Sequence, residues 1–144
     1  MQEHSPKWKL LDHTADVRIE VHGESLENLF LNAAQALTHL LVGSPQHVEV
    51  TIEKSLTLEG DSMDILLVNW LRELLFYFSA EQFVCKDTIV RFEKPNLIQA
   101  QLSGFTTDFT DKDNDGLEIK GVTYHGLSLD ETADGFVARV IFDI

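Results

Sequence analysis

The stretch DVRIEVHGESLENLFLNAAQALTHLL, residues 16–41, contains two different hydrophobic periods in succession. In residues 16–22 apolar and polar side chains alternate, which predicts a half-buried β-strand. Gly23 ends this strand, and Ser25 has the side chain of a helix N-cap. Apolar residues then recur three and four positions apart up to Leu41, so an amphipathic helix is predicted that ends near Gly43.

The remaining sequence extends this strand and helix into a longer series of elements. A second helix, apolar on most of its circumference, is predicted from Asp61 or Ser62 to Ser79. Strands are predicted at residues 8–11, 47–59, 83–93, 96–103, 117–129 and 136–142. The order β-β-α-β-α-β-β-β-β favours an α+β fold, with a mainly antiparallel sheet and two amphipathic helices packed on one side of it. Because no repeat or linker interrupts this series, residues 1–144 are predicted to form one domain.

The composition is that of a globular and strongly acidic chain. Hydrophobic residues make up 44% of it, and the net charge is −13, from 24 Asp+Glu against 11 Lys+Arg. Phosphate contacts need Lys and Arg, so direct binding to nucleic acid is not expected. The charge instead suits a cation or a basic protein partner, or it confers solubility alone.

Several classes of protein are excluded by what the sequence lacks. The longest apolar runs are too short to span a bilayer, and the first ten residues do not resemble a signal peptide. The single cysteine, Cys85, leaves no internal disulfide and no cysteine-built zinc site. We therefore expect a cytoplasmic protein that does not contact a membrane. Neither a G-x-S-x-G motif nor a glycine-rich phosphate loop occurs.

Acidic groups at two distant points of the sequence are candidates for a metal site. Asp12, His13 and Asp16 lie where the first two predicted strands meet, and Asp143 lies beside the α-carboxylate of Ile144. Neighbouring carboxylates repel each other unless a cation lies between them, and an all-oxygen site prefers Ca²⁺ or Mg²⁺ to zinc. The spacing alone favours the simpler interpretation, which is a solvated terminus and a turn.

A second possible metal site is the segment DKDNDG at residues 111–116, which matches the first half of an EF-hand loop. The twelfth position of that loop should be a bidentate Glu, but it is Val122, and a strand pattern follows it in place of a helix. We therefore interpret Asp111–Gly116 as an exposed acidic loop. A calcium-binding interaction module that uses this loop is kept as an alternative.

Lys120 and His125 are further candidates on the predicted strand at residues 117–129. Lys120 is either a charge partner of nearby acidic groups or a contact to a partner or a phosphate. His125 with Asp16 and Asp143 would make a stand-alone metal-dependent hydrolase, provided that these groups lie within proton-transfer distance. This hydrolase is the second alternative.

Four segments together resemble the archease family in their order and spacing. They are Asp12–Asp16, Leu67–Leu75, Glu118–Leu127 and Val140–Ile144. The resemblance extends from about residue 8 to the last residue. Two features depart from the family pattern, namely Gly121, where an alanine is commoner, and the acidic loop at residues 111–116.

The resemblance implies a function that the composition does not indicate. Archeases are protein cofactors, not enzymes, and they activate an RtcB-type RNA ligase, which uses GTP to join RNA ends in tRNA splicing and RNA repair. The resemblance assigns metal ligation to Asp16, Asp143 and the C-terminal Ile144, with Asp12, His13 and Lys120 near the ion or facing the partner. It thereby favours a divalent-ion site over a solvated terminus, with Ca²⁺ expected first and Mg²⁺ or Mn²⁺ as alternatives.

Overall fold

The strands form two antiparallel sheets in a computed structural model that describes residues 7–11, 16–108 and 116–144. The first sheet has the order β1-β2-β7-β6, with β1 at Trp8–Leu10, β2 at Asp16–Gly23, β7 at Gly135–Asp143 and β6 at Gly121–Thr132. The second sheet has the order β3-β5-β4, with β3 at Ile52–Glu59, β5 at Leu97–Thr106 and β4 at Phe83–Lys94. All the pairs are antiparallel.

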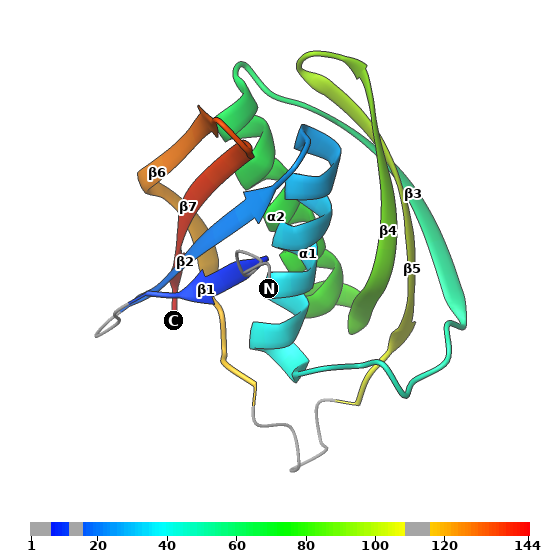
Figure 1. Cartoon of the computed structure of the whole chain (residues 1–144). Coiled ribbons are helices and arrows are strands. Elements are labelled where there is room, and N and C mark those ends of the chain that lie inside the picture. The colour runs from blue at the N-terminus through cyan, green and yellow to red at the C-terminus, as the bar shows by residue number, and fades with distance from the viewer. Residues whose placement is uncertain (1–6, 12–15, 109–115) are drawn as a thin grey trace, which may run out of the picture.

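Two helices, α1 (Leu26–Val42) and α2 (Met63–Glu81), lie between the two sheets (Figure 1). α1 contacts β2 and β7 on one side and β4 on the other, and α2 contacts β6 on one side and β3 and β4 on the other. α1 begins as its sequence predicts, because the hydroxyl of the N-cap Ser25 accepts a hydrogen bond of 3.1 Å from the amide of Asn28.

The predicted α+β class, the antiparallel pairing and the order of all nine elements are confirmed. One feature differs from the prediction of a single sheet with both helices on one side. The strands form two sheets, which cover the helices from two sides. The reason lies in the width of the apolar helix surfaces. Ten of the residues of α1 are buried, and a helix that is apolar over so wide an arc must be covered from more than one direction.

The core is one continuous cluster that draws on both sheets and both helices. Trp70 of α2 is fully buried in it and donates a hydrogen bond of 2.9 Å from its indole nitrogen to the carbonyl of Phe30 in α1. This bond satisfies the polar atom of a large aromatic residue while its ring fills the space between the layers. The contact between the two helices is therefore part of a core to which both sheets also contribute buried side chains.

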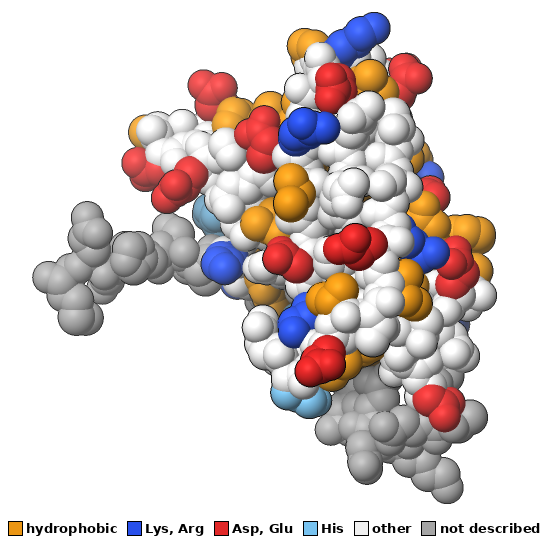
Figure 2. All heavy atoms as spheres, turned by 90° about the vertical axis from the view of Figure 1, so that its right-hand side faces the viewer, with side chains coloured by type: hydrophobic (Ala, Val, Ile, Leu, Met, Phe, Trp, Pro, Cys, Tyr) orange, Lys and Arg blue, Asp and Glu red, His pale blue; other side chains and the backbone are white. Residues whose placement is uncertain are grey.

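The outer face of the three-stranded sheet is open to solvent. Figure 2 shows this side, on which hydrophobic side chains are scattered singly among charged and polar ones. Ile89, which is 66% exposed, is the most exposed large hydrophobic residue in the described part of the chain. Neither helix combines the length and the apolar character that a membrane crossing requires, among the residues described.

Candidate functional site

Asp16 and Asp143 lie directly opposite each other at one end of the four-stranded sheet. Asp16 begins β2, Asp143 ends β7, and the two residues are partners in the β2–β7 register. Their neighbours Val17 and Phe142 are also partners, and both are buried in the core. Because successive side chains in a strand alternate, the two carboxylates share the outer face of the sheet. Residues 127 positions apart in the sequence therefore form one acidic pair.

The electrostatics of this pair favour a cation. Residues directly opposite in an antiparallel pair hold their Cβ atoms about 5 Å apart, and like charges at that separation are destabilising. Arg18 relieves part of the repulsion, since its Nε lies 3.4 Å from Oδ1 of Asp16. The side chain of Asp16 is 32% exposed and Asp143 is exposed, so a divalent ion from solvent can reach both.

The backbone before β6 encloses the same end of the sheet. The amide of Lys120 donates a hydrogen bond of 2.7 Å to the carbonyl of Asp143, and Gly121 is the register partner of Asp143 in β6. A Cβ atom at Gly121 would lie 3.9 Å from Oδ2 of Asp143, so the carboxylate stands beside this glycine. Lys120 thus contacts one of the two acidic residues through its backbone, and the role of its side chain stays a prediction.

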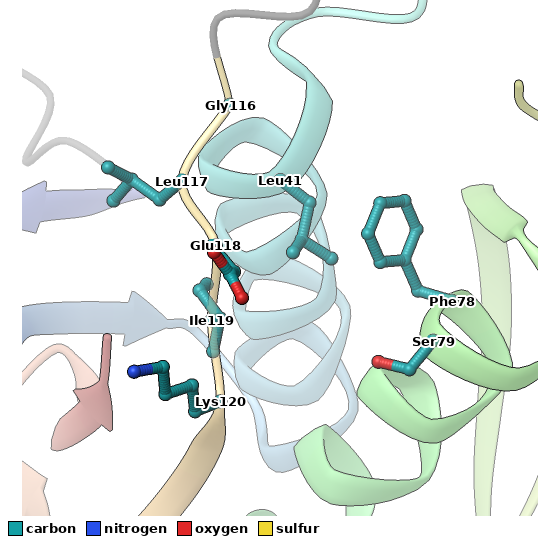
Figure 3. Close-up of a pocket in the computed structure, with 8 residues that line it drawn as sticks. All are labelled: Leu41, Phe78, Ser79, Gly116, Leu117, Glu118, Ile119 and Lys120. Atoms are coloured by element: carbon teal, nitrogen blue, oxygen red, sulfur yellow. The ribbon is translucent and has the colours of Figure 1, made fainter. Parts of the chain in front are cut away.

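A hollow of about 580 Å³ lies on the other side of the segment before β6. Residues at the C-terminal ends of both helices line it, together with residues 116–120. Figure 3 shows that Lys120 points away from Phe78 and Ser79 of α2. The ammonium group of Lys120 therefore does not point towards the α2 residues that line this hollow.

A buried carboxylate further along the same face fixes the strands that carry the pair. Glu20 of β2 is 7% exposed and forms ion pairs of 3.1 Å with Lys9 of β1 and with Arg139 of β7. Its hydrogen bonds to His22, Lys9 and Arg139 lower the pKa of Glu20 from 4.5 to about 2. The register that places Asp16 opposite Asp143 is thus held by a charged cluster four residues away.

Not every predicted site residue can be placed beside this pair. Asp12, His13 and residues 111–115 of the acidic loop lie outside the described residues. Ile144, 37% exposed, follows Asp143 directly. His125 lies four residues beyond Gly121, which is about 13 Å along a regular strand, and its part of β6 is irregular between Thr123 and Ser128. No hydrogen bond or ion pair joins His125 to Asp16 or Asp143 among the described residues, so the hydrolase arrangement gains no support.

The donor set fits a hard cation in its chemistry. Two carboxylates on one face offer the oxygen ligands that Ca²⁺ and Mg²⁺ prefer. Within residues 7–11, 16–108 and 116–144, no group of three or more His, Cys, Asp or Glu side chains could hold a metal ion. A complete site would therefore need further oxygens beyond Asp16 and Asp143, from the α-carboxylate, from water or from Asp12.

Two other side chains with reactive or charged groups have clear surroundings. Burial raises the pKa of the Cys85 thiol to about 12, which disfavours the nucleophilic thiolate form. Arg72 of α2 contacts β6 through Val122 and Tyr124. Within the sequence, Arg72 stands out only as a member of the segment Leu67–Leu75. The available signal was Phe76, an aromatic residue four positions later on the polar side of the helix.

The arrangement is that of a small α+β protein in which two helices lie between two antiparallel sheets, and here Asp16 and Asp143 lie opposite each other on the neighbouring strands β2 and β7. The model of the archease protein family matches residues 8–144 of the chain. The chain belongs to the archease protein family.

Individual relatives agree with this assignment over their full lengths. Protein archease of Archaeoglobus fulgidus is 34% identical over 142 residues, which cover 96% of this chain and 99% of the relative. Protein archease of Methanosarcina barkeri is 32% identical over 148 residues, with 100% of each chain covered.

Two solved structures are similar to the fold. Protein 1598 of Methanobacterium thermoautotrophicum superposes with a TM-score of 0.75 at 25% identity, covering 96% of this chain and 99% of the other. A structure described as an archease and possible chaperone, from Thermotoga maritima, superposes with a TM-score of 0.65 at 22% identity, covering 99% and 100%. The latter likeness concerns the fold alone.

Proposed function

We propose that the chain is a metal-binding protein cofactor that activates an RtcB-type, GTP-dependent RNA ligase in tRNA splicing and RNA repair, in the cytoplasm. Membership of the archease family supports a role as an accessory protein, and the family resemblance supplies the ligase. The observation that carries the proposal is the placement of Asp16 opposite Asp143. Two carboxylates fixed in register make a site that is unfavourable when empty and favourable with a divalent ion.

The residues have distinct tasks in this function. Asp16 and Asp143 would hold the ion, with the α-carboxylate of Ile144 as a further oxygen ligand, and Ca²⁺ is proposed first, ahead of Mg²⁺ and Mn²⁺. A divalent ion neutralises phosphate charge, which the transfer of a guanylyl group to the ligase requires. The accessory protein would either present this ion to the ligase or stabilise an open ligase conformation by binding it preferentially.

The test is a guanylylation assay with a catalytic amount of the protein. An RtcB-type ligase is incubated with GTP and a substoichiometric amount of the chain, and guanylylated ligase is followed over time. The unaltered chain should accelerate the reaction, and Asp16→Asn and Asp143→Asn should each abolish the stimulation without unfolding the protein. Asp130→Asn is the matched control, because Asp130 is an exposed carboxylate elsewhere on β6.

Two results would count against the proposal. If the unaltered chain gave no stimulation, the ligase assignment would fail. If Asp16→Asn and Asp143→Asn stimulated as well as the unaltered chain, the ligase role would survive, but the carboxylate pair would have no part in it.

A further inference from the structure

Arg72 is a cation held in place by neutral groups in a chain of strongly negative charge. Its Nε donates a hydrogen bond of 3.0 Å to the carbonyl of Val122, and its Nη1 donates one of 2.8 Å to the hydroxyl of Tyr124. The guanidinium also stacks on the ring of Tyr124, with its central carbon 4.2 Å from the ring centroid. Although the chain contains 24 Asp+Glu, Arg72 has no carboxylate partner among the described residues.

This geometry leaves part of the guanidinium available. An arginine has five N–H donors in a planar fork, and the contacts to Val122 and Tyr124 use two of them. The second terminal nitrogen has no acceptor in the part of the chain that is described, and Arg72 is exposed. Because the two hydrogen bonds and the stacked ring already fix the side chain, binding an anion would cost little further ordering.

Two exposed aromatic residues lie near Arg72, one stacked against its guanidinium and one on the same helix surface. Tyr124, on which Arg72 stacks, is 43% exposed, and its hydroxyl also lies 3.4 Å from Oδ1 of Asn69. Phe76 is 57% exposed and follows Arg72 by four positions in α2, so the two side chains are neighbours on the helix surface. We call Asn69, Arg72, Phe76 and Tyr124 the α2–β6 face. It combines the residue types that dominate binding energy at protein interfaces.

We infer that the α2–β6 face is a docking surface for a partner protein that presents a carboxylate side chain to Arg72 beside an apolar side chain packed on Phe76. A carboxylate matches the planar edge of a guanidinium with two parallel hydrogen bonds. The occupant is a protein and not a nucleic acid. A chain of net charge −13 repels a polyphosphate backbone, and a single arginine attracts it only locally. This assignment of a partner rests on the proposed function, in which the partner is the ligase.

The test measures affinity for the ligase and for calcium separately. An RtcB-type ligase is titrated against the labelled chain, and Arg72→Gln and Phe76→Ala should each weaken binding by about tenfold or more. Tyr124→Phe keeps the ring and loses the hydroxyl bond, so its loss should be smaller. Ile89→Ala is the matched control, because Ile89 is 66% exposed on the other sheet and should bind as the unaltered chain does. Calcium binding by calorimetry should be the same in all four variants.

Stability measurements separate docking from a purely structural role. Arg72 also ties α2 to β6, so Arg72→Gln is expected to lower the melting temperature, whereas the exposed Phe76 makes no such tie and Phe76→Ala should not. Unchanged ligase affinity in Phe76→Ala would overturn the docking surface, as would an equal loss in Ile89→Ala. Binding of a single-stranded RNA that Arg72→Gln abolishes would overturn the choice of a protein partner. Failure of the unaltered chain to bind the ligase would overturn the proposed function together with this inference.

Discussion

Glu20 is a single carboxylate that joins three strands of the sheet carrying the candidate site. Lys9 reaches it from β1 and Arg139 from β7, each at 3.1 Å, while Nε2 of His22 lies 3.0 Å away within β2 itself. The carboxylate is buried while Lys9 and Arg139 are more than half exposed, so solvent screens part of the attraction. The cluster favours the ionised carboxylate in the folded state, which is why its pKa falls to about 2.

Replacing this carboxylate should lower stability in a way that depends on pH. The folded-state pKa of Glu20, about 2, lies below its ordinary value of 4.5. Its contribution is therefore complete above pH 4.5 and is lost as the pH falls towards 2. At pH 7 we expect Glu20→Gln to reduce the free energy of unfolding by about 1 to 2 kcal/mol. Urea titrations at pH 7 and pH 3 should show a smaller difference from the unaltered chain at pH 3.

The control for this comparison is Asp130→Asn, which removes an exposed carboxylate of β6 that has no ion pair among the described residues. It should differ little from the unaltered chain at either pH. An equal loss in Glu20→Gln at pH 7 and pH 3 would mean that the lost stability comes from packing, and not from the ionised carboxylate.

At the scale of single elements, two glycines on strands of different sheets differ in the space that the backbone leaves for a side chain. Gly104 of β5 pairs with Cys85 beside a register shift in β4, and a Cβ atom there would lie 1.8 Å from the carbonyl of Val84. Gly121 of β6 has open space, because the nearest atom to an added Cβ is Oδ2 of Asp143 at 3.9 Å. Neither glycine is among those with a positive φ, so space alone separates the two positions.

Alanine at these two positions should therefore have opposite effects. Gly104→Ala forces β4 and β5 apart, and we expect it to lower the free energy of unfolding by about 2 to 3 kcal/mol. Gly121→Ala meets no steric conflict and restricts the unfolded chain, so it should be neutral or stabilise by up to about 1 kcal/mol. Urea unfolding followed by circular dichroism measures both. Similar losses at the two positions would contradict the steric argument and indicate a shared dependence on strand flexibility.

The elements themselves were predictable from local patterns, whereas their limits depend on partners elsewhere in the chain. The sequence predicts a strand from residue 47, but β3 begins at Ile52, whose partner is Gly104 near the end of β5. The predicted strand from residue 117 likewise begins at Gly121, the first residue of β6 that pairs with β7. In both cases the alternating pattern begins before the first residue that pairs with a neighbouring strand. The sequence pattern alone therefore predicts strand starts that are too early.

The candidate site was likewise predictable only where local sequence patterns decide the structure. Alternation of side chains along the last strand is enough to put Asp143 on the face opposite Phe142, and Asp143 is exposed on β7. No local pattern could place it opposite Asp16, because that contact depends on which of seven strands become neighbours. The family resemblance supplied that information in advance. The contact of Arg72 with Tyr124 is equally non-local, since it joins a helix to a strand 52 residues later.

At the scale of the whole molecule, the two layers on either side of the helices make the site depend on the entire core. β2 and β7 rest on α1, which rests in turn on β4 of the other sheet (Figure 1). Buried residues of all these elements belong to one cluster. The position of the two carboxylates is therefore fixed by packing throughout the protein, and an ion that binds between them must stabilise the folded molecule as a whole.

The effect of Asp143→Asn on the melting temperature should therefore change sign when calcium is added. Without divalent ions, Asp143→Asn removes a like-charge contact with Asp16, so we expect its melting temperature to equal or exceed that of the unaltered chain. With calcium at about one hundred times its dissociation constant, the unaltered chain gains about 2.7 kcal/mol, and the order of the two melting temperatures reverses. The comparison uses calorimetric scans with EDTA or CaCl₂, and NaCl at matched ionic strength accounts for the screening of the net charge of −13.

Asp130→Asn should respond to calcium as the unaltered chain does, whereas equal responses in all three chains would mean that calcium binds elsewhere or only screens charge.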